Sequence, residues 1–138
     1  MTLSDRTWRR TGWCSELFAR HTCLDLDSQE RELAETSEDL FISAISTFDI
    51  ARLLSNELLR LRHRFVEWKE ISFAELRALP VDLTHEIAWE ANNLSGSFHN
   101  DPADRLLVAT ARLMKLTLVT ADNLILRYPH VKTMSALR

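Results

Sequence analysis

Apolar positions along the chain follow two different spacings. Residues 40–45 and 116–120 are short apolar or β-branched runs that predict strands, and residues 79–82 form a third extended run. Between them, apolar residues recur at intervals of three and four, which predicts helices. Strands that alternate with helices indicate βα units and a mostly parallel sheet covered by helices on both faces. The predicted fold class is therefore α/β, as a single domain over residues 1–138.

Helix starts are marked by capping residues. Asp101 is placed to act as an N-cap, and Pro102 would then occupy the first helical position, where its missing N–H costs nothing. Behind the strand at 40–45, Ser46 and Asp49 have the spacing of a capping box. Further helices are predicted over 28–36, over 84–92 and directly after Asp122.

The first 23 residues fit this pattern least. Met1–Ser4 is a candidate first strand, although Met1 and Leu3 are its only apolar residues. Residues 5–23 show no regular period, and Gly12 interrupts the one helical face that they offer. We therefore regard residues 1–23 as the atypical part of the domain.

Composition indicates a folded chain and excludes few functions. Hydrophobic residues make up 46% of the sequence and charged residues 27%, as in ordinary globular domains. The net charge of −3 does not indicate nucleic-acid binding, yet arginine outnumbers lysine by 14 to 3, and arginine suits bidentate phosphate contacts. The basic clusters are Arg6, Arg9 and Arg10, and the segment Arg60–Arg64.

The two cysteines indicate a reducing compartment. We expect a cytoplasmic protein with reduced thiols, because the sequence shows neither a signal-peptide pattern nor a membrane-length apolar run. Cys14, His21 and Cys23 could be imagined as metal ligands, but no second half-site has matching spacing.

Carboxylates recur at the predicted junctions between strands and helices. Asp49 follows the strand at 40–45, Asp101 and Asp104 open a helix, and Asp122 follows the strand at 116–120. In a parallel sheet these junctions share one edge, where such folds bind ligands. Each acid alone could simply cap a helix, but converging carboxylates repel one another and favour a cation. Oxygen ligands suit Mg²⁺ or Mn²⁺, ions that activate water for phosphodiester hydrolysis.

Several segments together resemble the PIN domain, in the form found in VapC-type ribonuclease toxins of toxin–antitoxin pairs. The resemblance covers residues 24–133. The segments that carry it are FHNDPADRLLVATA at 98–111, LVTAD at 118–122, FISAISTFDIA at 41–51, LPVDLTHEIA at 79–88 and YPHVKT at 128–133.

This resemblance implies a three-layer α/β/α fold and a metal-dependent endoribonuclease that uses Mg²⁺ or Mn²⁺. It also implies RNA as substrate, a small antitoxin as partner, and a homodimer. The acids of the family correspond to Asp49, Asp104 and Asp122, with Asp101 as an accessory acid near the metal. Arg105 is a candidate contact for substrate phosphate, and the alternative is a solvated or ion-paired arginine.

Two features depart from the family pattern. Its second-motif acid is usually glutamate, whereas this chain has the shorter Asp49. Its first acid ends an apolar strand; spacing favours Asp5 for this role, but the preceding residues are not an apolar run, and Asp25 and Asp27 are alternative donors. A degraded first motif would impair the enzyme.

Two other functions compete with the nuclease. One is a catalytically impaired PIN-like module that still binds its antitoxin. The other is a receiver-like phosphoacceptor, which needs a lysine after a late strand, whereas Lys115 precedes the strand at 116–120. Among the remaining residues, His99 is interpreted as structural, and Trp68 and Trp89 as core or partner-interface residues.

Overall fold

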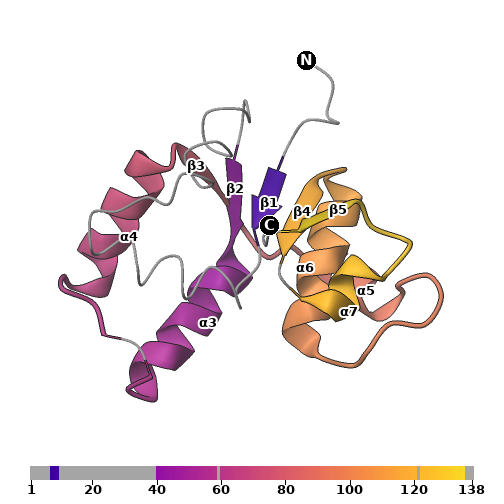
Figure 1. Ribbon diagram of the computed structural model, residues 1–138, viewed down its shortest axis with the longest axis horizontal. Coiled ribbons are helices and arrows are strands. Elements are labelled where there is room, and N and C mark those ends of the chain that lie inside the picture. Colours follow the sequence, from indigo (N-terminus) through magenta and orange to yellow (C-terminus); the bar gives the residue numbers. More distant parts are fainter. Residues whose placement is uncertain (1–6, 10–39, 59, 121, 136–138) are drawn as a thin grey trace.

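A five-stranded parallel sheet forms the centre of the molecule. The computed structural model describes residues 7–9, 40–58, 60–120 and 122–135, the first of these ranges by its backbone alone. The strand order is β3-β2-β1-β4-β5, and every neighbouring pair is parallel (Figure 1). The strands are β1 (Thr7–Arg9), β2 (Leu40–Ser43), β3 (Ala78–Val81), β4 (Thr117–Thr120) and β5 (Thr133–Ser135).

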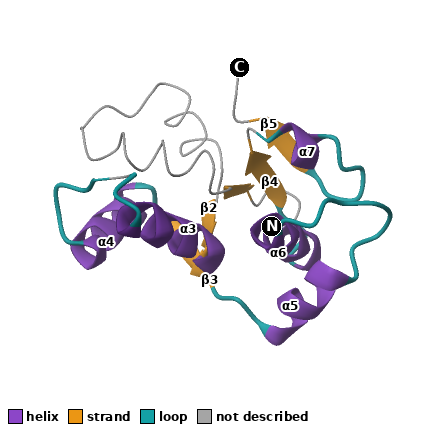
Figure 2. Cartoon of the chain, turned by 90° about the horizontal axis from the view of Figure 1, so that it is seen from below, coloured by secondary structure: helices purple, strands orange, loops and turns teal. Residues whose placement is uncertain are grey.

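Helices cover both faces of this sheet. Figures 1 and 2 place α3 and α4 on one side and α5, α6 and α7 on the other, so that the fold has three layers. This confirms the predicted α/β/α architecture with a parallel sheet. The helices are α3 (Ala44–Ser55), α4 (Phe65–Glu75), α5 (His85–Asn92), α6 (Pro102–Leu113) and α7 (Asn123–Leu126).

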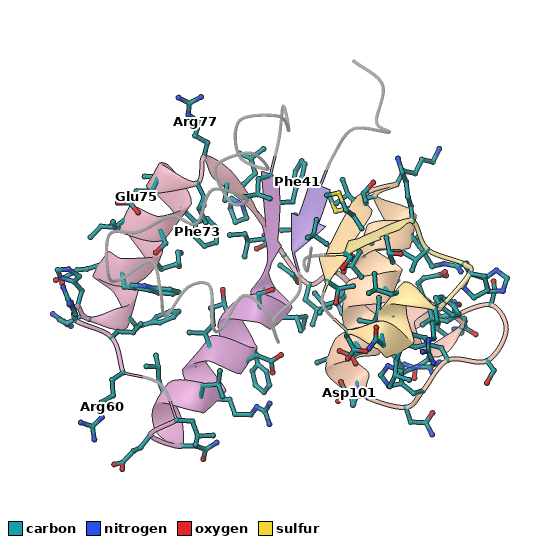
Figure 3. All side chains as sticks on the ribbon, viewed as in Figure 1. Phe41, Arg60, Phe73, Glu75, Arg77 and Asp101 are labelled. Atoms are coloured by element: carbon teal, nitrogen blue, oxygen red, sulfur yellow. The ribbon has the colours of Figure 1, made fainter. Side chains whose placement is uncertain are left out.

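Strand β2 contributes to two separate hydrophobic cores. Phe41 packs into the cluster formed with α5, α6 and α7, while Leu40 and Ile42 pack into the cluster that contains Trp68 of α4. Figure 3 labels Phe41 on β2 and Phe73 on α4, which packs against the second cluster. Successive side chains of a strand point to opposite faces, so one short run can serve both layers. Trp68 is 3% exposed, which confirms a core position, whereas Trp89 is 74% exposed.

The predicted capping box at Ser46 and Asp49 is wrong. Strand β2 ends at Ser43, two residues earlier than predicted, and the Ser43 hydroxyl accepts a hydrogen bond from the Ile45 N–H at 3.1 Å. The earlier start allows Ile45 to pack in the core on the α6 side of the sheet. Asp49 therefore lies in the second turn of α3, and the first turn contains no acid.

The centre of the sheet is formed by β1, between β2 and β4. The strand predicted at Met1–Ser4 and the helix predicted at 28–36 lie outside the described residues. Asp5 is also outside them, and in the sequence it precedes β1, whereas the acid of the predicted first motif was expected to follow its strand.

No helix in the described part of the chain is long and apolar enough to cross a bilayer. The two longest, α3 and α6, have 12 residues each, against about 20 for a membrane-spanning helix.

Candidate active site at the carboxyl edge of the sheet

The start of α6 brings two acids together, as the sequence predicts. Asp101 is the N-cap, with its Oδ1 accepting a hydrogen bond from the Asp104 N–H at 3.0 Å, and Pro102 occupies the first turn. Asp101 is exposed to solvent, whereas Asp104 is only 2% exposed. The positive end of the helix dipole favours a negative charge in this turn. The cap is therefore Asp101, and the buried carboxylate beside it is Asp104.

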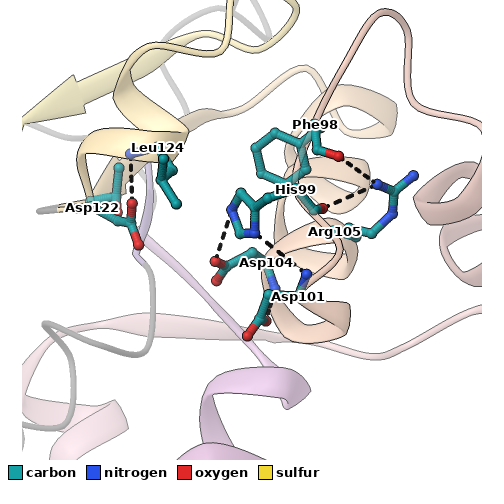
Figure 4. A network of polar contacts seen from close by, with 8 residues as sticks. Phe98, His99, Asp101, Asp104, Arg105, Asp122 and Leu124 are labelled. Atoms are coloured by element: carbon teal, nitrogen blue, oxygen red, sulfur yellow. Dashed lines mark hydrogen bonds and ion pairs between the residues drawn. The ribbon is translucent and has the colours of Figure 1, made fainter.

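Asp104 contacts the imidazole ring of His99. His99 Nε2 lies 3.2 Å from Asp104 Oδ2, and His99 Nδ1 accepts a hydrogen bond from the Asp101 N–H at 3.4 Å (Figure 4). His99 thus has a contact on each ring nitrogen, one to each end of the acidic turn. Sequence reasoning treated His99 as structural only, although its place in the same short segment as the two acids was the available signal.

Arg105 holds the loop that precedes α6. Its Nε donates to the carbonyl of Ala91 at 2.8 Å, and its Nη1 donates to the carbonyls of Phe98 and His99 at 3.1 Å each. These contacts to backbone carbonyls differ both from the predicted phosphate contact and from the solvated or ion-paired arginine that was its alternative. Binding of substrate phosphate by Arg105 stays a prediction that the described geometry does not support.

Asp122 occupies the turn between β4 and α7. It is the N-cap of α7: its Oδ1 accepts a hydrogen bond from the Leu124 N–H at 2.7 Å, and its own N–H donates to the Thr120 hydroxyl at 3.1 Å. Thr120 is fully buried at the end of β4, so the turn is anchored in the core. In Figure 4 the carboxyl group of Asp104 points toward the side on which Asp122 lies.

Asp49 does not complete a three-acid cluster. Its carboxylate lies 3.7 Å from Arg52 Nη2, and its side chain is 15% exposed. Within the described ranges, no group of three or more Asp, Glu, His or Cys side chains is arranged to hold a metal ion. Within the described residues Asp49, Asp104 and Asp122 therefore do not form such a group by themselves. A metal site that these acids share with residues outside the described ranges stays a prediction.

The acidic side chains present are of the chemical type that binds a divalent cation. Asp104 and Asp122 offer carboxylate oxygens, the ligands that Mg²⁺ and Mn²⁺ prefer. The further donors proposed from the sequence, Asp5, Asp25 and Asp27, lie outside the described residues, and the structure assigns none of them.

Comparisons with known proteins agree with this fold. The PIN domain family model matches residues 24–131, so that Asp25 and Asp27 lie within the match and Asp5 lies outside it. Ribonuclease VapC22 of Mycobacterium tuberculosis is 34% identical over 96 residues, which cover 70% of this chain and 72% of that protein.

Solved structures share the architecture at lower identity. The VapBC2 complex of Rickettsia felis bound to promoter DNA matches with a TM-score of 0.70 at 18% identity, covering 94% of this chain and 98% of that one. DNA-bound VapBC of Salmonella typhimurium matches with a TM-score of 0.68 at 13% identity, covering 94% and 97%. With its parallel sheet and its acids at the carboxyl edge, this chain belongs to the PIN domain family and is similar to VapC proteins.

Proposed function

We propose that this chain is a metal-dependent endoribonuclease that acts as the toxin of a toxin–antitoxin pair in the cytoplasm. The observation that carries the proposal is the buried carboxylate of Asp104, in the first turn of α6 and directed toward the side of Asp122 at the carboxyl edge of a PIN fold. The relative VapC22 is named a ribonuclease, and VapBC complexes share the fold, which supports the activity and an antitoxin partner.

Asp104 and Asp122 would hold Mg²⁺ or Mn²⁺, and the exposed Asp101 would be an accessory acid beside them. When bound, such an ion activates water and stabilises charge in phosphodiester hydrolysis. The chain's own contribution is to fix the two acids: Asp104 by the first turn of α6, and Asp122 by its hydrogen bonds to Leu124 and Thr120. These local contacts would hold the two carboxylates in place before the ion binds.

The third carboxylate of the site is the open part of the proposal. Asp25 and Asp27 lie within the residues that match the family, which favours them over Asp5. Asp49 would act at longer range, or through water, because its carboxylate pairs with Arg52. A homodimer is proposed on the resemblance to VapC proteins alone.

Cleavage of RNA with controlled metal content tests the proposed function. The purified chain is expected to cleave RNA with Mg²⁺ or Mn²⁺, to lose cleavage in EDTA, and to regain it when Mn²⁺ is added back. Asp104→Asn should fold, because the amide group has nearly the size and shape of the carboxyl group, but should not cleave. Absence of Mn²⁺ binding and of cleavage in the unmodified chain, with an antitoxin still bound, would instead identify the catalytically impaired module.

A further inference from the structure

We propose that residues 60–64, the basic segment between α3 and α4, are a second contact for RNA, and that the arginines of this segment bind backbone phosphates of the substrate away from the bond that is cleaved. The inference rests on the proposed function, because it names a surface that holds the substrate of the same enzyme. It goes beyond the acidic site, because carboxylates attract a cation but repel the phosphates of an RNA strand.

Positive charge is concentrated in the basic segment. Its sequence, RLRHR, contains three arginines and a histidine, and no acid stands between Glu57 and Glu67. The chain as a whole has a net charge of −3, so the segment is a local exception. Phosphate contacts through lysine and arginine supply most of the sequence-independent affinity of proteins for nucleic acids. Arginine can donate two parallel hydrogen bonds to one phosphate, so the composition of the segment suits a phosphate contact.

Arg60 and Arg64 are exposed, and their guanidinium groups are available to a ligand. Among the described residues, neither side chain takes part in a hydrogen bond or an ion pair. Arg64 occupies the N-cap position of α4, but its side chain makes no capping hydrogen bond. Arg105 differs, since its N–H groups donate to three backbone carbonyls. The two exposed arginines are therefore better able to bind phosphate than the arginine beside the acids.

The backbone of the basic segment is anchored to the core, although its charges face solvent. Leu61 and Phe65 are partly buried and pack against the hydrophobic cluster that contains Trp68. The ring centroid of Phe65 lies 5.8 Å from that of Trp68. Arg60 and Arg64 each directly precede one of these two anchors. Little backbone therefore has to be ordered when a phosphate binds, which lowers the entropic cost of binding.

The basic segment lies on the side of the molecule that carries the acids. Helix α3 begins directly after β2, at the carboxyl edge, and leads away from the sheet to the segment (Figure 1). In Figure 3, Arg60 and Asp101 lie toward the same side of the molecule, and Arg77 lies on the opposite side. With 12 residues, α3 is about 18 Å long, the length of about five stacked nucleotides at ~3.4 Å each. A ligand that reaches from the acids to the segment has to be long and extended, as an RNA strand is.

Screening by salt limits what each group of charges can do. At 0.1 M salt the Debye length is about 10 Å, so the arginines act on the part of the strand that passes over them and not on the phosphate at the acids. Loss of their charge is therefore expected to weaken RNA binding without involving the acids. Carboxylates of an acidic protein segment can also pair with arginine. The position of the segment on the acidic side favours RNA, and the test includes an acidic polypeptide.

Binding of a labelled RNA in EDTA tests this contact without cleavage. The probe is a fluorescein-labelled oligouridylate of ~20 nucleotides, longer than the ~4–16 nucleotides that single-strand binding modules cover. Fluorescence anisotropy gives its dissociation constant at several salt concentrations. In the double variant Arg60→Gln/Arg64→Gln this constant should rise about tenfold, and the slope of log affinity against log salt should fall by about 1.4, because each single-strand phosphate contact contributes about 0.7.

Two further double variants serve as controls. Arg60→Lys/Arg64→Lys keeps both charges and should keep the salt slope. Arg77→Gln/Lys115→Gln removes the same charge from exposed residues that precede β3 and β4, at the opposite edge of the sheet. Its dissociation constant should stay within about twofold of that of the unmodified chain. The melting temperatures of all three double variants should agree with that of the unmodified chain, since the substituted side chains are exposed.

Equal dissociation constants and salt slopes in Arg60→Gln/Arg64→Gln and the unmodified chain would overturn the proposal, as would an equal loss in the Arg77→Gln/Lys115→Gln control. Unlabelled poly-L-glutamate of equal charge is added as a competitor. If it displaces the probe as well as unlabelled oligouridylate does, the segment binds an acidic protein and not RNA. Cleavage with Mn²⁺ is measured separately: a chain that binds RNA through the segment but does not cleave keeps this contact and loses only the nuclease assignment.

Discussion

Gly96 lies against the imidazole of His130: a Cβ built on residue 96 would sit 3.0 Å from His130 Nε2. Gly96 also has a φ of +69°, in the left-handed region that only glycine adopts readily. Both constraints act on the loop that leads to the candidate site, so this position tests how much the loop contributes to folding.

Gly96→Ala is expected to destabilise the chain by about 1–2 kcal/mol, because the added methyl group meets both the backbone strain and the close contact with His130. Urea unfolding followed by circular dichroism measures the change. Ser97→Ala, at the neighbouring exposed position, should stay within about 0.5 kcal/mol. An equally stable Gly96→Ala variant would show that the loop adapts to the side chain.

Substitutions at Asp101 separate the helix cap from the accessory metal role. Asp101→Ala removes the acceptor for the Asp104 N–H and should cost about 1 kcal/mol in unfolding free energy. Asp101→Asn keeps an accepting oxygen and should retain that stability. If Asp101 also contacts the ion, Mn²⁺ affinity should fall in both variants. Unchanged affinity in Asp101→Asn would leave Asp101 as a cap only.

Arg105→Lys distinguishes a structural arginine from a phosphate contact. Lysine keeps the charge but cannot donate to the carbonyls of Ala91, Phe98 and His99 together, so we expect a loss of about 2 kcal/mol in unfolding free energy. The exposed Arg127→Lys is the matched control, with a change within about 0.5 kcal/mol. Full stability of Arg105→Lys combined with weakened RNA binding would restore the substrate contact.

The start of α5 should respond to acid. Hydrogen bonds from the backbone N–H of Glu86 and from Thr84 hold the pKa of the Glu86 carboxyl below its usual value of 4.5. A lowered pKa in the folded state stabilises the helix start above pH 4.5, and this contribution is lost as the pH falls through the folded-state pKa. The protection factor of the Ile87 amide, which is its exchange rate relative to that of an unstructured peptide at the same pH, is compared between pH 6 and pH 3 to check this. Glu86→Gln should remove the pH-dependent part of the difference, and an unchanged pH dependence in that variant would contradict the assignment.

The sequence predicted one helix start correctly and misplaced another for a physical reason. At α6, Asp101 and Pro102 indicate the same start, because a helix tolerates proline without cost only in its first turn. At α3, Ser43 and Ser46 are both acceptable caps, and local sequence cannot choose between them. Packing decides, because a start at Ala44 brings Ile45 and Ile50 into the two cores. That start places Asp49 in the second turn of α3 rather than in the first.

Other features that the sequence did not predict also depend on tertiary contacts. The central strand β1 includes Thr7 and Arg9, whose polar side chains give no strand pattern, so only its pairing with β2 and β4 identifies it. His99 shows the same limit within the site. Its sequence position was visible, but the contact with Asp104 depends on how the loop folds back onto α6.

The loop before α6 is also connected to the far end of the chain. Ser95 accepts hydrogen bonds from Tyr128 at its carbonyl and from Arg112 at its hydroxyl, and Arg112 also donates to the carbonyl of His130. The segment after α7 is thus joined by hydrogen bonds to the start of this loop and to the last turn of α6. A chain that ends before Tyr128 would keep Asp104 and Asp122 in its sequence but would lose the hydrogen bonds of Tyr128 to Ser95 and of Arg112 to His130. The arrangement of the two acids would then depend on residues that do not contact them.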